Sequence, residues 1–352
     1  MRFSVPTLPP SLGGQVPVAL PIEIEPLVVG TPVRVRSQLE TAALKPLSCP
    51  IPASIADILS GPRGSALGYH SVATSLECPT KKMLINLGVE PKRDRVYDAD
   101  GVEVEPAFDG SGKINAKLYG SIVHALLAVR IVHGVEAAER VLFVEGQYTP
   151  FSIALGAENA IRLLLILRLY DQAHPLSAEP FTYISVEQPI SSDIGDGNGG
   201  SLVRTATYDA VVASREQRVV FSLEKKTSAR GGSSAMDVYA GQFATQVTVW
   251  NSNPHLVKTY GPMAGVIPDV IVKTATPKIE RHGVRYISKF VQHLATGYLR
   301  LPDQIMYPNG VANTPLGLPA YLHACWGRFD PCVYIPLCWE GSHGEFEQRE
   351  HP

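Results

Sequence analysis

The sequence lacks long hydrophobic runs. Its richest apolar stretch, AIRLLLILRLY, is interrupted by Arg162 and Arg168, and it is shorter than the ~18 apolar residues that a membrane-spanning helix needs. A secretory signal has a continuous apolar segment followed by a small-residue cleavage site. The first thirty residues contain no such segment. We therefore expect no membrane span and an intracellular, cytoplasmic protein.

The sequence also lacks an excess of charge of either sign. Its 31 lysines and arginines nearly balance 33 aspartates and glutamates, and the formal net charge is −2. Because nucleic-acid-binding domains are often strongly basic as a whole, any contact with nucleic acid must come from local basic clusters. Candidate phosphate-binding side chains are Lys225, Lys273, Lys278 and Arg281. The hydrophobic content of 45% indicates a globular protein.

Cysteine is scarce, with five in 352 residues, but four of the five form a pattern. Cys325, Cys332 and Cys338 are spaced C-x6-C-x5-C, and Cys78 lies far upstream. Grouped cysteines in a reducing compartment favour metal ligation over disulfides. A zinc ribbon usually has two close pairs of cysteines, whereas this chain has one remote cysteine and a widely spaced trio. This spacing favours a 4Fe–4S cluster over a zinc ribbon. We expect a structural cluster that joins the two ends of the chain, with zinc or simply buried cysteines as alternatives, and Cys49 stands apart.

The periodicity of the sequence predicts an arm and one folded domain. Residues 1–60 are rich in proline and predict an extended arm with one or two short strands, followed by a domain over residues 61–345. Helices are expected at 70–87, 115–132, 157–172 and 236–251, and strands at 181–190, 202–214, 217–227 and in a hairpin over 265–294. This order predicts an α/β fold with a mixed central β-sheet flanked by helices.

Two neighbouring predicted strands carry residues suited to phosphodiester chemistry. Asp209 lies on one strand, and Glu224 and Lys226 lie on the next. Because side chains alternate along a strand, Glu224 and Lys226 project from the same face. Two carboxylates suit Mg²⁺ or Mn²⁺, and a lysine beside them can position a water or stabilise charge on a phosphate. The alternative reading is a set of solvent-facing charges, since short motifs occur often by chance.

Two helical segments add to this set. His124 lies on the predicted helix 115–132, and Gly120 one turn earlier leaves room for a close approach. Gln242 lies on the helix after the hairpin, where its amide could hold a phosphate, a metal-bound water or the lysine. A lone helical histidine is more often a core or surface residue, so the set is informative only as a whole.

Taken in order, the segments GSIVH, YDAVV, LEKKT and GQFATQ resemble the PD-(D/E)XK nuclease superfamily, and within it the RecB-type branch that includes CRISPR adaptation nucleases and AddB subunits. The resemblance implies a restriction-endonuclease-like core over residues 115–252. It also implies one or two Mg²⁺ or Mn²⁺ ions near Lys226, which would position or activate the attacking water. The implied metal ligands are His124, Asp209, Glu224 and the backbone carbonyl of Lys225.

The resemblance implies accessory residues as well. Gln242 and Gln246 match the glutamine helix of the branch, and Trp250 offers a second register of that motif from Gln246. Glu187 falls where the branch often has a glutamate beside the metal. The segment SLECPTKK resembles the upstream cysteine helix of the branch, and C-x6-C-x5-C resembles the closing trio of phage-encoded members.

The sequence therefore favours a metal-dependent deoxyribonuclease that acts on single strands or ends and carries a structural 4Fe–4S cluster. Its partners would be DNA and proteins of recombination or replication. The second hypothesis is a catalytically silent module of nuclease fold that binds DNA or assembles a DNA-processing complex. A third is a zinc-stabilised structural protein whose acidic hairpin faces solvent.

Overall fold

The computed structural model describes the central part of the chain and several short segments. The described residues are Leu44, 47–59, 73, 89–91, 96–97, 103–104, 114–216, 218–228, 239–274, 276–306 and 346–348. All of them belong to the compact unit Thr41–Pro352. The four cysteines predicted to hold a cluster, Cys78, Cys325, Cys332 and Cys338, lie outside the described residues.

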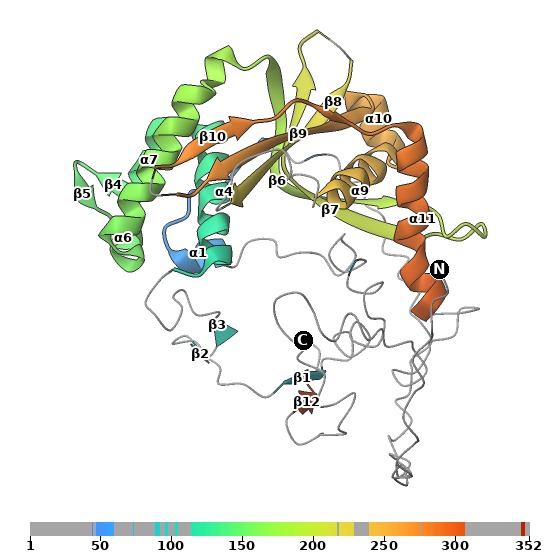
Figure 1. The fold of residues 1–352 in the computed structure, drawn as a ribbon, viewed down its shortest axis with the longest axis horizontal. Coiled ribbons are helices and arrows are strands. Elements are labelled where there is room, and N and C mark those ends of the chain that lie inside the picture. Colours follow the sequence, from blue (N-terminus) through green and yellow to red (C-terminus); the bar gives the residue numbers. More distant parts are fainter. Residues whose placement is uncertain are drawn as a thin grey trace, which may run out of the picture. The chain divides into compact units, whose positions relative to one another are not determined.

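A six-stranded mixed β-sheet forms the centre of the described part (Figure 1). Its strands are β6 (Phe181–Asp193), β7 (Val203–Ser214), β8 (Val220–Ser228), β9 (Met263–Val272), β10 (Lys278–Arg281) and β11 (Arg285–Tyr286). The order is β10-β9-β8-β7-β6, and β11 also pairs with β9. Only β8 and β9 pair in parallel; the other pairs are antiparallel. The α/β class and the mixed sheet predicted from the sequence are confirmed.

The parallel pair forms the buried centre of the sheet. Positions along β8 are buried from Val220 to Lys225, and β9 is buried along nearly all of its length. This continuous burial is typical of strands that are covered by helices on both faces. A strand with one face in water would instead alternate between buried and exposed residues. The connection between β8 and β9 runs through helices, as a parallel pair requires.

Helices cover both faces of the sheet, with α4 and α7 on one side and α9, α10 and α11 on the other (Figure 1). The larger helices are α4 (Ala116–His133), α5 (Val135–Leu142), α6 (Pro150–Leu155), α7 (Ala157–Ala173), α9 (Ala240–Asn251), α10 (Pro254–Tyr260) and α11 (Lys289–Met306). Asn115 caps α4 by accepting a hydrogen bond from the backbone N–H of Lys117. Within the described residues, no helix combines the length and apolar character that crossing a membrane requires.

The predicted helices at 115–132, 157–172 and 236–251 correspond to α4, α7 and α9, and the long strands lie where the sequence placed them. The hairpin over 265–294 is only partly right, because α11 begins at Lys289. The segment between α4 and α7 forms α5, α6 and the strands β4 (Phe143–Val144) and β5 (Gln147–Tyr148), which the periodicity did not predict.

The prediction of an extended arm is wrong for the described residues near its end. Ile55–Leu59 form the helix α1, and Asp57 accepts hydrogen bonds from the backbone N–H groups of Ala53 and Ser54. Cys49, Ile55 and Ile58 pack against the apolar cluster around α4. These residues therefore add to the core of the domain.

Among the described residues, three short strands lie upstream of α4, and one lies near the end of the chain. They are β1 (Val89–Pro91), β2 (Val96–Tyr97), β3 (Glu103–Val104) and β12 (Phe346–Gln348). β2 pairs with β3, and β1 pairs antiparallel with β12. The second pairing brings a segment from the first third of the sequence next to its far end.

Candidate metal centre

Helix α4 approaches the sheet closely at the level of His124. A Cβ atom built on Gly120 would lie 3.1 Å from the Oγ1 atom of Thr227 on β8, a tighter contact than most side chains tolerate. Glycine at this position therefore allows the helix to come near the strand. His124 follows one turn later, and its side chain is 22% exposed.

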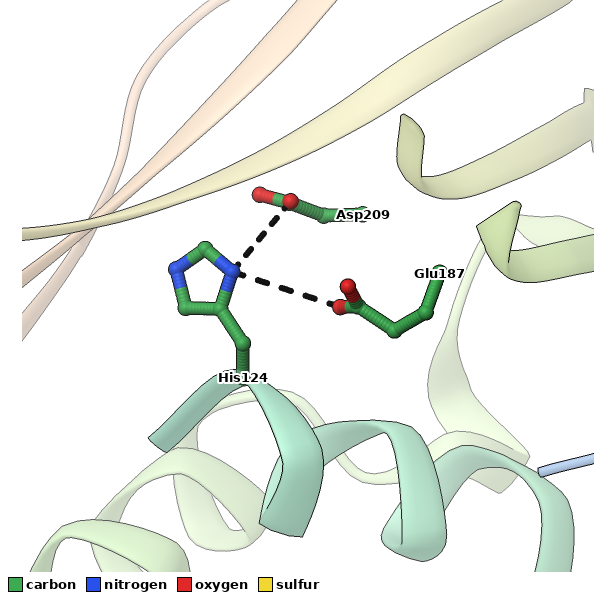
Figure 2. Close-up of side chains that lie close together, drawn as sticks. All are labelled: His124, Glu187 and Asp209. Atoms are coloured by element: carbon green, nitrogen blue, oxygen red, sulfur yellow. Dashed lines mark ion pairs between the residues drawn. The ribbon is translucent and has the colours of Figure 1, made fainter. Parts of the chain in front are cut away.

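His124 meets two carboxylates that stand opposite each other on β6 and β7. The strands pair Val186 with Ala210 and Gln188 with Tyr208, so Glu187 and Asp209 lie across from one another. Figure 2 shows one nitrogen of the His124 ring directed at both carboxylates. Nδ1 lies 3.2 Å from Oδ1 of Asp209 and 4.0 Å from Oε1 of Glu187.

The backbone is irregular where Glu187 enters the site. Its φ angle is 45°, a left-handed conformation that few non-glycine residues adopt. In a regular strand, Val186 and Ile190 would lie on the same face, because they are four residues apart. Instead, Val186 packs with the apolar cluster near α4, and Ile190 packs with the cluster around α9. The strand therefore twists at Glu187. Unfavourable conformations of this kind persist only where the surrounding structure holds them, and they are frequent at functional sites.

The three side chains perturb one another's ionisation. Burial alone would lower the pKa of His124, but the neighbouring Asp209, as a charge and hydrogen-bond partner, raises it above its ordinary value. Burial alone would raise the pKa of Asp209, yet His124 holds it well below its usual range. Burial, followed by the charge of Asp209, raises the pKa of Glu187 to about 7. Opposed shifts in one cluster are typical of functional sites.

Glu224 lies next to this group but is bound by other partners. Its side chain is 1% exposed. Oε1 accepts hydrogen bonds from Ser222 Oγ at 3.3 Å and from Gln246 Nε2 at 2.5 Å. Oε2 accepts from Lys226 Nζ at 3.0 Å and from Gln242 Nε2 at 3.2 Å. Four donors thus hold one carboxylate, and its pKa is raised by burial and by the charge of Asp209.

The glutamine motif on α9 acts on Glu224. Gln242 and Gln246 are four residues apart on α9 and both reach the same carboxylate, as side chains one helical turn apart can. We expected Gln242 to contact the lysine or a phosphate, and in the structure its amide donates to Glu224. Trp250, the alternative aromatic of this motif, is buried and donates from its indole nitrogen to the carbonyl oxygen of Gly261.

Asp209 connects the two halves of the site. Its Oδ1 faces His124, and its Oδ2 accepts a hydrogen bond of 2.7 Å from the backbone N–H of Lys225. The residue after Lys225 is Lys226, whose ammonium binds Glu224 and lies 5.1 Å from the centre of the Tyr239 ring. Burial alone would lower the pKa of Lys226, but the charge of Glu224 raises it above its usual range.

The structure therefore sorts the predicted site residues into two adjoining groups. His124, Asp209 and Glu187 form one group, in which ligand atoms all lie within 4.8 Å of one another. Glu224, Lys226 and the two glutamines form the other. Glu187, which the sequence suggested only as an accessory, takes the third position in the first group, and Glu224 does not take part in it. No family model matches the chain, and no curated protein matches its sequence.

The first group has the donor chemistry and spacing of a divalent metal site. Two ligand atoms about 2.1 Å from an octahedral ion are about 3.0 Å apart when adjacent and about 4.2 Å apart when opposite. The distances from His124 Nδ1 to the two carboxylates fall close to this range. Oε1 of Glu187 is buried and has no hydrogen-bond partner among the described residues, so it carries a lone pair for which a cation is the natural partner.

A second buried polar cluster, near the edge of the sheet, has a structural character. Asp269 on β9 is fully buried and receives two hydrogen bonds from Arg281, at 2.7 and 2.8 Å, and one from the hydroxyl of Tyr170. Arg281 also donates to Glu179 at 2.7 Å. The suggestion that Arg281 contacts a phosphate is therefore wrong, because its guanidinium group is occupied by two carboxylates.

Proposed function

We propose that this chain is a metal-dependent deoxyribonuclease of the PD-(D/E)XK type, which hydrolyses phosphodiester bonds in single strands or at DNA ends. The convergence of His124, Asp209 and Glu187, with Glu224 and Lys226 directly beside them, carries the proposal. The placement of these side chains supports it too. The histidine lies on a helix before the sheet, Asp209 on the second of three successive long strands, and the E-x-K sequence on the third.

The proposed roles follow from the contacts. His124, Asp209 and Glu187 would hold Mg²⁺ or Mn²⁺, with Glu224 and the carbonyl oxygen of Lys225 as further candidate ligands. The bound ion would polarise the phosphate and lower the pKa of an attacking water. The raised pKa of Lys226 means that its ammonium keeps its protons at neutral pH. Lys226 would therefore donate hydrogen bonds to the water or to the phosphate.

The exposed fractions of the side chains indicate from which side a substrate would approach. The side chains of His124 and Glu187 are 22% and 30% exposed, although the carboxylate of Glu224 behind them is almost completely buried. A phosphate would thus approach from the side of His124 and Glu187. The exposed ligands would contact it, and the buried half would fix the orientation of Lys226.

A 4Fe–4S cluster held by Cys78, Cys325, Cys332 and Cys338 remains part of the proposal, with zinc as the alternative metal. The pairing of β1 with β12 supports it, because β1 follows Cys78 in the sequence and β12 follows Cys338. The paired strands β1 and β12 thus follow, in the sequence, the two segments that contain the predicted cysteine ligands.

A catalytically silent module of the same fold is the second candidate. One observation favours it: every oxygen of Glu224 is already engaged by Lys226, Ser222 or the two glutamines of α9. A carboxylate held in this way could serve only the stability of the fold. The two candidates make opposite predictions for catalysis.

Cleavage of linear and circular single-stranded DNA by anaerobically purified protein with Mn²⁺ tests the proposal. Glu224→Gln is the matched variant, because it keeps the size of the side chain and a hydrogen-bonding oxygen but removes the charge. We expect cleavage by the wild type and a loss of at least a hundredfold in the variant, which should remain folded by circular dichroism but melt at a lower temperature, because the new amide nitrogen faces hydrogen-bond donors. A folded wild type that cleaves neither substrate with Mn²⁺ would favour the silent module, and equal cleavage by both proteins would remove Glu224 from the mechanism.

A further inference from the structure

Lys225 is a buried cation to which the proposed mechanism assigns no side-chain role. It lies between the two motif residues in the sequence EKK, and its side chain is completely buried, with 0% exposure. A buried ammonium group is rare unless it is paired. Within the described residues, this ammonium group donates a long hydrogen bond, 3.5 Å, to the backbone carbonyl oxygen of Asp209.

Lys225 is bound to Asp209 through both its main chain and its side chain. Its backbone N–H donates to Oδ2 of the Asp209 carboxylate at 2.7 Å, and its ammonium donates to the backbone carbonyl oxygen of Asp209 at 3.5 Å. Lys225 therefore places a buried ammonium group next to Asp209, one of the carboxylates that would hold the metal.

The number of charges at the site limits the number of ions it can hold. The site contains three carboxylates, those of Glu187, Asp209 and Glu224, and two lysine ammonium groups. Lys226 pairs with Glu224, and Lys225 donates to the backbone carbonyl oxygen of Asp209. With a neutral imidazole on His124, this leaves one net negative charge. One divalent ion would make the site positive by one charge, which suits an anionic phosphate. A second divalent ion would leave three positive charges in a partly buried site, where repulsion between them is strong.

We propose that Lys225 replaces a second metal ion, and that the site binds a single divalent cation. The inference rests on the proposed function, because it concerns the same site. It decides whether that metal site holds one divalent ion or two. The buried ammonium would supply a fixed positive charge behind Asp209. The single ion would then lie on the exposed side, next to His124 and Glu187.

Calorimetric titration of the whole protein with Mn²⁺ at pH 8, together with counting of bound Mn²⁺ by electron paramagnetic resonance, tests this proposal without an activity assay. We expect one ion per wild-type chain. Lys225→Met, which keeps the length of the side chain, should bind a second ion or bind the first at least tenfold more tightly. Lys258→Met on α10 removes the same charge from an exposed position and should bind as the wild type does.

Two bound ions in the wild type would overturn the proposal even if DNA cleavage is normal. So would a folded Lys225→Met protein that binds a single Mn²⁺ ion, and binds it no more tightly than the Lys258→Met control. Should Lys225→Met not fold, the wild-type count still decides, and Lys225→Gln repeats the comparison with a buried polar side chain. A wild type that binds no Mn²⁺ would contradict the metal site itself, a result distinct from a count of two.

Discussion

Replacing Glu187 with glutamine is expected to stabilise the metal-free protein and to weaken its response to a divalent ion. In the folded, metal-free protein, burial and the charge of Asp209 raise the pKa of Glu187 from 4.5 to about 7. The folded protein therefore retains a proton that the unfolded chain releases between about pH 4.5 and pH 7. As the pH rises through this window, ionisation of Glu187 lowers the free energy of unfolding.

The size of the effect follows from the pKa shift. At about 1.4 kcal/mol per pH unit, the ionised carboxylate would cost about 3 kcal/mol at pH 8 as an upper limit. The side chain is 30% exposed, and solvent screening reduces the expected value to about 1–2 kcal/mol. Glu187→Gln should raise the free energy of unfolding by this amount at pH 8 and by almost nothing at pH 4.5.

The sign should reverse when a metal ion is added. Saturating Mn²⁺ stabilises a protein with one intact site by about 2.7 kcal/mol at a hundredfold excess over the dissociation constant. Glu187→Gln has lost one anionic ligand and should gain much less. Glu145→Gln is the matched control, because Glu145 has the same left-handed backbone conformation, with φ 51°, but lies on the exposed β4–β5 turn.

Urea denaturation at pH 8 and pH 4.5, with and without Mn²⁺, measures all four values. A Glu187→Gln protein that is less stable than the wild type in metal-free buffer at pH 8 would show that the ionised carboxylate of Glu187 does not destabilise the fold. An equal gain in stability from Mn²⁺ in both proteins would show that Glu187 is not a ligand.

Three further outcomes are expected. Gly120→Ala should lower the free energy of unfolding by at most about 1 kcal/mol, because the ~1 kcal/mol gain in helix propensity offsets part of the cost of the contact with Thr227. Adding Thr227→Ala should recover this loss in urea denaturation; additive losses would contradict the contact between them. Gln246→Leu should reduce the rate of DNA cleavage more than Gln242→Leu, because its hydrogen bond to the buried carboxylate is shorter (2.5 against 3.2 Å); equal rates for the two variants would argue against this ranking. Cys332→Ser should lose the brown colour and the bound iron measured by elemental analysis, and a variant that keeps both would remove Cys332 from the cluster.

The site illustrates how far sequence patterns lead. The period of α4 predicted the helix that carries His124, and the alternation along β8 predicted that Glu224 and Lys226 share a face. Both are local properties, because they depend only on the geometry of a regular helix or strand. Gln242 and Gln246, which the sequence offered only as a motif match, are four residues apart and reach the same carboxylate from α9.

Other features depend on tertiary structure and were beyond local patterns. The left-handed backbone at Glu187 brings that carboxylate to His124, and no glycine marks the position in the sequence. The helix α11 contains Gly297 and Pro302, residues that disfavour helices, and it follows directly after a short strand. Packing against α9 and the hydrogen bonds of Arg300 to the loop after β6 compensate for this weak propensity.

The location of a bound divalent ion tests the central claim most directly. An anomalous difference map from a crystal grown with Mn²⁺ would place the ion without reference to activity. We expect a peak within about 2.5 Å of His124 Nδ1 and of one oxygen each from Asp209 and Glu187. A fully occupied Mn²⁺ peak elsewhere, with none between these three side chains, would contradict the account.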